Sequence, residues 1–180
     1  RQISFHGTLA DGGASWSIDG SIDGLEFTPE LHTAVPAPIA ERFAELRSVR
    51  ATANLAFHVA SPDQEGELPT FRVKGRIGRG RIDDARLPFP LTDLRADFEL
   101  NNQLIKVTDF QAQNGQTVLT LTAQRDGLQS SSPLQLTAHC KQLTLARDLV
   151  AKLPENWRAN WNKFLPSGVV DAHLTLAFDG

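Results

Sequence analysis

Strict alternation between apolar and polar residues is the feature that most constrains how this chain can fold. In the segment 94–100 every second residue is apolar and the residues between them are charged. Successive side chains of a β-strand point to opposite faces, so a period of two predicts a strand with one apolar face and one solvated face. Similar segments occur at 71–77, 104–113 and 117–124. The chain is therefore expected to be built mainly from strands.

Short turn sequences separate these segments. Asn101-Asn102, Asn114-Gly115 and Asp126-Gly127 supply residues that tolerate the left-handed backbone conformation of a tight hairpin. Consecutive strands joined by hairpins form an antiparallel meander. A doubly wound sheet would instead need a helix after every strand, which this pattern does not offer.

An internal repeat links the two ends of the chain. A shift of 118 residues carries the apolar residues of 16–31 onto those of 134–149. The same shift carries Pro36 onto Pro154, and each proline opens a segment with helical spacing. We expect helices near 36–47 and 148–165, each lying against a sheet. Their packing faces would be formed by Ile39, Phe43 and Leu46 in the first copy and by Trp157, Trp161 and Phe164 in the second.

The strands on either side of this block also recur. Ile3–Gly12 matches Val118–Gly127 at a shift of 115, and 55–57 matches 176–178 at a shift of 121. The pattern therefore predicts one full period and part of another.

We accordingly expect one β-rich segment, 1–180, of a longer repeating protein. Residues 1–57 would form a partial repeat, and 58–180 the remainder of that period and the start of the next. The chain contains no methionine and does not begin with one, which suggests an excised fragment. The predicted fold class is mainly β (β-rich α+β), as an elongated curved antiparallel sheet or β-groove repeat with one short amphipathic helix per period.

Composition argues against several classes of function. The net charge is −3, whereas nucleic-acid binders normally carry a broad positive field. A single cysteine, Cys140, cannot form an intramolecular disulfide, and no apolar run approaches the roughly 20 residues needed to cross a bilayer. We predict no nucleic-acid partner, and any membrane anchor would lie outside this segment.

The residue patterns of common active sites are also missing from the sequence. The five histidines are scattered singly, there is no His-Glu-x-x-His or cysteine pair for zinc, and no Gly-x-Ser-x-Gly. The basic face of Arg72, Lys74 and Arg76 could contact anionic headgroups, but such a strand face is more often simply solvated. We predict a protein that is not an enzyme, with no catalytic, cofactor-binding or metal-binding residues.

Two stretches carry a resemblance to a known family. Leu91–Ala123 follows a cadence of pre-strand phrase, strand, short turn and two further strands, and 167–176 looks like the opening of a new unit. This pattern resembles the AsmA-like superfamily, which includes TamB-type and YhdP-type envelope proteins. The resemblance implies a repeating β-groove, tethered to the inner membrane of a diderm bacterium and extending through the periplasm, that guides phospholipids along an apolar channel in outer-membrane biogenesis.

The resemblance implies no catalytic residue and makes a phospholipid or other acyl lipid the expected partner, together with neighbouring repeats of the same chain. The apolar strand positions would line the groove. Those candidates are Leu94, Ala96, Phe98, Leu100, Leu119 and Leu121. The alternative is that the helix carrying Trp157 and Trp161 packs on the same face and closes it. A second possible function is a scaffold module of the cell envelope that associates through exposed strand edges.

Overall fold

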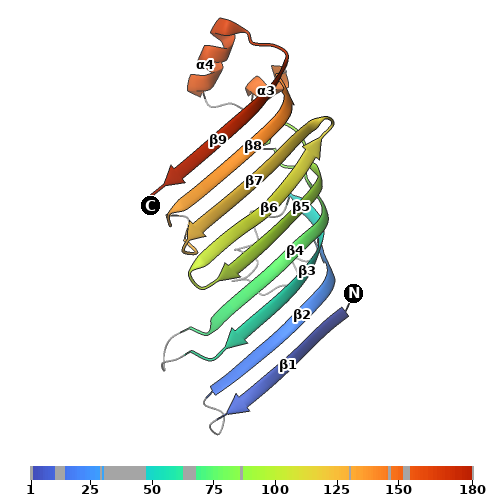
Figure 1. Cartoon of the computed structure of the whole chain (residues 1–180), viewed down its shortest axis with the longest axis vertical. Coiled ribbons are helices and arrows are strands. Elements are labelled where there is room, and N and C mark those ends of the chain that lie inside the picture. The colour runs from blue at the N-terminus through green and yellow to red at the C-terminus, as the bar shows by residue number, and fades with distance from the viewer. Residues whose placement is uncertain are drawn as a thin grey trace.

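A single antiparallel sheet of nine strands forms the body of the molecule (Figure 1). The computed structural model describes residues 2–10, 15–28, 30, 48–62, 68–85, 87–129, 131–145, 147–151 and 155–179. The strands lie in the sheet in the order in which they occur in the chain, so every neighbour in sequence is also a neighbour in space. The fold is therefore mainly β, as the alternation predicts.

The strands are long and joined mostly by hairpins. They are β1 (Gln2–Ala10), β2 (Ser15–Phe27), β3 (Val49–Ala60), β4 (Thr70–Ile82), β5 (Thr92–Asn101), β6 (Leu104–Asn114), β7 (Thr117–Asp126), β8 (Leu134–Thr144) and β9 (Val169–Phe178). Two predicted tight turns lie where expected, between β5 and β6 and between β6 and β7. Gly115 adopts a φ of 58°, and Asn101 Oδ1 accepts a hydrogen bond from the backbone N–H of Gln103 at 2.9 Å.

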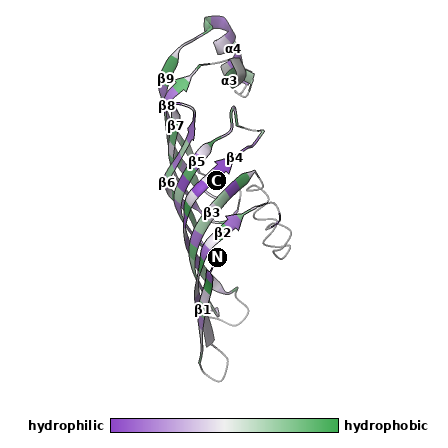
Figure 2. Ribbon diagram, turned by 90° about the vertical axis from the view of Figure 1, so that its right-hand side faces the viewer, coloured by the Kyte–Doolittle hydropathy of each residue, from purple (hydrophilic) through white to green (hydrophobic). Residues whose placement is uncertain are grey.

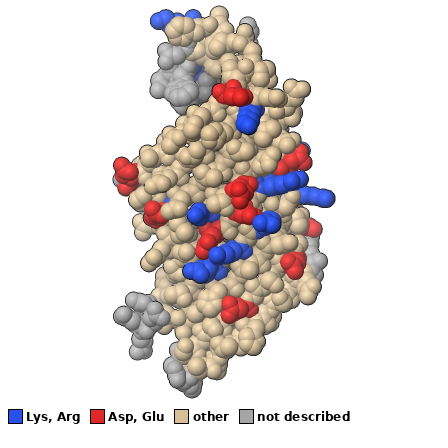
Figure 3. All heavy atoms as spheres, in the orientation of Figure 1, with Lys and Arg blue, Asp and Glu red and all other residues tan. Residues whose placement is uncertain are grey.

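The two faces of the sheet differ in chemistry. Lys, Arg, Asp and Glu side chains gather over the central strands on the face shown in Figure 3, and the register places the apolar residues of each strand on the other face. Seen edge-on in Figure 2, the sheet is bowed, with the charged face on the outside of the bow. The apolar face consequently lies on the inside.

One patch of the apolar face is packed within the chain. Leu91, Leu94 and Ala112 form a buried cluster, against which Leu87 and Phe89 of the β4–β5 connection pack. A further contact holds this connection to the start of β3: Ser48 Oγ donates a hydrogen bond to Asp84 Oδ2 at 2.8 Å. The connection thus folds back to cover one end of the central strands.

Much of the remaining surface stays accessible. The chain exposes 12584 Å² at a mass of 19.7 kDa, whereas a compact monomer of that mass would expose roughly 8,600 Å². The described strands form a single layer, and a sheet in one layer leaves apolar side chains accessible, which contributes to the excess.

β2 and β8, which the predicted repeat aligns with each other, share an irregularity. Pairing is interrupted by a bulge between Ile22 and Leu25, and again between Cys140 and Leu143, which are the same positions after a shift of 118. The bulged residues, Gly24 and Gln142, adopt positive φ angles of 68° and 54°. The two strands therefore share a local backbone structure that their sequences barely show.

A side chain on the next strand caps each bulge. Asn54 Oδ1 accepts a hydrogen bond from the N–H of Gly24 at 2.9 Å, and Asp171 Oδ1 accepts one from Gln142 at 2.9 Å. Asn54 and Asp171 differ by 117 positions.

The flanking strands are equivalent at offsets other than those predicted. Ile22 pairs with Ile3 and Cys140 with Leu119, so β1 corresponds to β7 at a shift of 116 rather than 115. On the other side Ile22 pairs with Leu55 and Cys140 with Ala172, so β3 corresponds to β9 at a shift of 117 rather than 121. A period-two pattern fits many registers, and a slip of one residue would place Ile3 over Val118, on the opposite face.

Two short helices occupy the β8–β9 connection. They are α3 (Arg147–Ala151) and α4 (Glu155–Phe164), in place of the one helix predicted over 148–165. Pro154 precedes α4 in the sequence, and a proline is poorly tolerated inside a helix. The helix predicted at 36–47 lies outside the described residues, so one helix per period stays a prediction. No described helix is long and apolar enough to cross a membrane.

Candidate functional site

A row of apolar residues crosses the whole sheet. Residues paired across neighbouring strands point to the same face, so the register can be followed from one edge strand to the other. The central row, as we name it, comprises Ile3, Ile22, Leu55, Gly75, Phe98, Val107, Ala123, Leu136 and Leu176. None of these nine side chains is polar.

A second row lies beside it, two residues away along each strand. It comprises Phe5, Gly20, Phe57, Val73, Leu100, Ile105, Arg125, Leu134 and Phe178. With eight inter-strand spacings of about 4.8 Å, the two rows make an apolar strip roughly 38 Å long. Half of a bilayer's hydrocarbon core is about 15 Å thick, so the strip is longer than one leaflet.

Two phenylalanine rings and two glycines shape the middle of this strip. A Cβ built on Gly75 would lie 2.3 Å from the Cζ of Phe98, and one built on Gly20 would lie 2.3 Å from the Cζ of Phe57. Each ring therefore occupies the space above the glycine of the neighbouring strand, where a side chain would displace it. At Gly20 and Gly75 the surface of the strip is therefore formed by the phenylalanine ring of the neighbouring strand.

The strip is covered unevenly. At its ends Phe5 is 76% exposed and Phe178 is 46% exposed, whereas Phe57, Val73 and Phe98 in the middle are half-buried. The face is thus most open at β1 and β9.

The six residues predicted to line a groove share the apolar face, but not the same environment. Leu94 is 2% exposed and Ala96 is 5% exposed, because they lie at the packed end of β5. The other four are half-buried: Phe98, Leu100, Leu119 and Leu121. Phe98 and Leu100 belong to the two rows, and Leu121 pairs with Ala138 in the neighbouring row towards the packed cluster.

The predicted helix faces can be followed only in part. Ile39, Phe43 and Leu46 lie outside the described residues, as does the side chain of Trp157. Trp161 is half-buried, whereas Phe164 is 71% exposed, with Lys163 Nζ 5.5 Å from its ring centre. α4 lies at the end of the sheet where β8 and β9 connect (Figure 1), so Phe164 does not pack on the strip.

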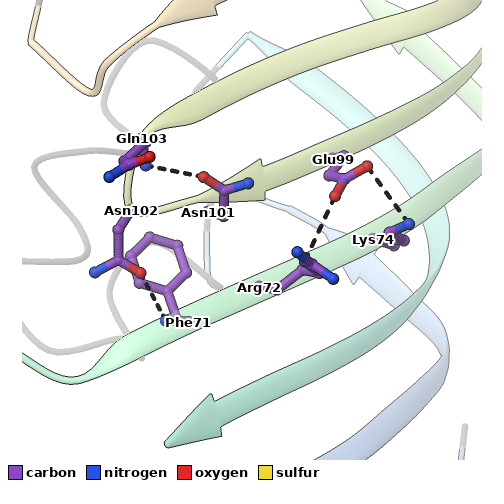
Figure 4. A network of polar contacts seen from close by, with 7 residues as sticks. All are labelled: Phe71, Arg72, Lys74, Glu99, Asn101, Asn102 and Gln103. Carbon is purple, nitrogen blue, oxygen red and sulfur yellow. Dashed lines mark hydrogen bonds and ion pairs between the residues drawn. The ribbon is translucent and has the colours of Figure 1, made fainter. Parts of the chain in front are cut away.

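On the opposite face Arg72, Lys74 and Arg76 of β4 are paired with acids of β5. Arg76 donates two hydrogen bonds to Asp97, from Nε at 2.6 Å and from Nη2 at 2.8 Å, and these bonds lower the pKa of Asp97. Glu99 lies between Arg72 and Lys74, at 3.6 Å and 3.5 Å from their nitrogens (Figure 4). The basic row is therefore largely neutralised and is poorly suited to an anionic headgroup.

Two shallow depressions lie at the hairpin ends of the sheet. The one next to β4 has a volume of about 780 Å³ and is lined by residues that include His58, Phe71, Arg72 and the Asn101–Gln103 turn. Its polar groups are already engaged: Asn102 Oδ1 accepts the N–H of Phe71 at 2.7 Å (Figure 4), and His58 Nδ1 lies 2.8 Å from Asp19 Oδ1.

The positions of three groups of side chains on the two faces were not predicted from the sequence. His139 and His173, expected to be isolated, are stacked with ring centres 4.1 Å apart on the polar face of β8 and β9. Cys140 lies on the apolar face, where burial, and then the charge of Asp171, raises the pKa of its thiol. The third is Arg125, which continues the apolar alternation of Leu119 and Leu121. The alternation in 117–126 would have been enough to predict that Arg125 lies on the apolar face.

No group of three or more His, Cys, Asp or Glu residues within the described part of the chain is placed to hold a metal ion. Comparisons with protein-family models, with curated proteins and with solved structures found no match to this chain. Inferences about function therefore rest on the two faces of the sheet.

Proposed function

We propose that this chain is a non-enzymatic segment of an AsmA-like protein of the periplasm, tethered to the inner membrane, and that it binds and guides the acyl chains of phospholipids along its apolar strip. The observation that carries this proposal is the central row, which crosses nine strands without a polar side chain. The bow of the sheet would make that face the wall of a shallow groove.

Physical chemistry supports an acyl chain as the occupant. An apolar surface gains about 25 cal/mol for each Å² removed from water, and a hydrocarbon chain matches the central row, which offers no hydrogen-bonding side chain. Contiguous exposed apolar area on this scale commonly marks an interaction surface. The paired charges of β4 and β5 leave the other face suited to water.

The direct test is solvent extraction of the purified chain, prepared without detergent, followed by mass spectrometry. A mock purification of an unrelated β-protein gives the background. We expect phospholipid to be enriched over this background. A wild-type chain that carries no more lipid than the mock, and takes none from vesicles, would overturn the proposal.

A matched pair of variants locates the lipid on one face. Leu174 is 52% exposed on the apolar face of β9, and its neighbour Thr175 lies on the polar face. Leu174→Asp should lower the lipid bound per protein about tenfold, because a carboxylate is costly beside hydrocarbon. Thr175→Asp should leave it unchanged. Circular dichroism spectra of both variants would verify that the sheet is intact.

The scaffold function remains a second candidate, favoured by the two edge strands. β1 and β9 form the edges of the described sheet, and both expose apolar side chains. Such edges can pair with strands of other chains. Analytical ultracentrifugation would reveal concentration-dependent self-association, and Phe178→Lys should reduce it. A lipid-free chain that self-associates would favour this function over lipid binding.

A further inference from the structure

Arg125 interrupts an otherwise apolar row. It lies near the end of β7, paired with Ile105 on one side and Leu134 on the other. Its side chain is half-buried, and the Nε of its guanidinium is buried.

The guanidinium lacks the partner that such a position normally requires. Arg125 Nε is buried and has no hydrogen-bond partner, and no described acidic side chain forms an ion pair with Arg125. A buried donor without a partner is costly, because it has given up its hydrogen bonds to water. Buried polar groups in proteins nearly always have a partner, so a buried donor without one calls for an explanation, and a bound anion would supply one.

The repeat shows that the fold does not need a cation here. At the shift of 116 that relates β1 to β7, Arg125 corresponds to Leu9, which pairs with Trp16 as Arg125 pairs with Leu134. One copy therefore has leucine at this place in the sheet and the other has arginine. The difference indicates that Arg125 has a function in the second copy that Leu9 does not have in the first.

We propose that Arg125 binds the anionic headgroup of an amphiphile whose acyl chain lies on the central row. This inference rests on the proposed lipid function and specifies its substrate class. The planar guanidinium offers a donor fork that matches a phosphate or a carboxylate, which a lysine would not reproduce. At the end of β7 a headgroup would contact Arg125 while its chain extends past Ala123 and Leu136.

Three amphiphiles with the same oleoyl chain test the assignment: oleate, oleoyl lysophosphatidylglycerol and neutral monooleoylglycerol. Equilibrium dialysis below the micelle concentration gives their affinities for the delipidated chain. We expect the wild type to bind at least one anionic amphiphile about tenfold more tightly than the neutral one, since a hydrogen bond to a charged group contributes about 1.5–3 kcal/mol. Which of the two it prefers distinguishes phosphate from carboxylate recognition.

Variants separate the headgroup contact from the fold. Arg125→Leu, the residue found in the other copy, should bind all three amphiphiles with the neutral compound's affinity, and Arg125→Lys should retain part of the preference. The control Arg79→Leu removes an exposed cation of β4 and should match the wild type.

The failures can be told apart. If all amphiphiles bind equally to the wild type and to Arg125→Leu, the headgroup assignment is wrong and the lipid function stands. If none binds, the lipid function itself fails. If inorganic phosphate alone binds as tightly as the lysophospholipid, Arg125 serves a free anion and the amphiphile assignment is overturned.

Discussion

The packed patch around Leu94 and the open strip at β9 belong to the same face of the same sheet, yet one behaves as a core and the other as a surface. Both arise from identical period-two patterns. They differ because the β4–β5 connection folds back over Leu91, Leu94 and Ala112, whereas Leu174 stays half exposed. Alternation therefore specifies which residues share a face, and a distant connection decides whether that face is covered.

The largest effect should come from truncating the packed patch. Leu94→Ala would leave a cavity in the buried cluster and lower the free energy of unfolding by about 2–5 kcal/mol. Leu174→Ala removes a half-exposed side chain and should cost less than about 1 kcal/mol. Urea unfolding followed by circular dichroism measures both. Equal losses would mean that the two regions are not distinct.

The next effect lies within the middle of the strip. Gly75→Ala would push against the rings and methyls of Phe98 and Leu55, where the added Cβ lies 2.3 Å and 2.7 Å from the nearest atoms. Overpacking of this kind typically costs about 1–3 kcal/mol. Gly78→Ala on the same strand meets no atom within 4 Å and serves as the control. A stable Gly75→Ala would show that Phe98 moves aside freely and that the strip is not a fixed surface.

A smaller change in the free energy of unfolding should come from the bulge of β8, next to the open edge strand β9. Gln142 adopts a φ of 54°, a conformation that costs an L-residue roughly 1–2 kcal/mol and costs glycine little. Gln142→Gly should therefore raise the free energy of unfolding by about 0.5–1 kcal/mol, after the entropy that glycine adds to the unfolded chain. The reciprocal Gly24→Gln should lower it. Thermal melts of the two variants would contradict the shared bulge if both moved in the same direction.

The smallest effect concerns the polar face and depends on pH. Arg76 lowers the pKa of Asp97 in the folded chain, so their pairing stabilises the fold above the unfolded carboxyl's pKa and is lost as pH falls through the lowered folded value. Asp97→Asn should make the Tm slightly lower at pH 7 and less sensitive to acid. Because both side chains are exposed, the gain is small. A double-mutant cycle with Arg76→Gln isolates it, and unchanged acid sensitivity would argue against the pair.

Sequence patterns alone predicted the central strands well. Asn101-Asn102 and Asn114-Gly115 located two hairpins, and period-two apolar residues located β4 to β7, because these signals are local. Register between copies was not predictable to the residue, since Ile3 fits opposite faces after a slip of one. Glutamine is not a residue type that predicts a positive φ. The φ of Gln142 depends on the pairing of β8 with β9 and on the hydrogen bond to Asp171.

The candidate site was predictable to a similar depth. The pattern gave the shared face of Phe98, Leu100 and Leu121, but the burial of Leu94 depends on Leu87 and Phe89, whose packing is a tertiary contact. The row that runs from Ile3 to Leu176 requires every strand pairing at once. No local pattern contains that information.

The strictly sequential order of the strands has a mechanical consequence. Each described strand pairs only with its neighbours in the chain, so adding or removing whole strands at an edge would leave the pairing of the other strands unchanged, as in other one-dimensional arrays. The six inter-strand spacings from β1 to its equivalent β7 span roughly 29 Å at about 4.8 Å each. The length of such a sheet, measured across its strands, is therefore proportional to the number of strands.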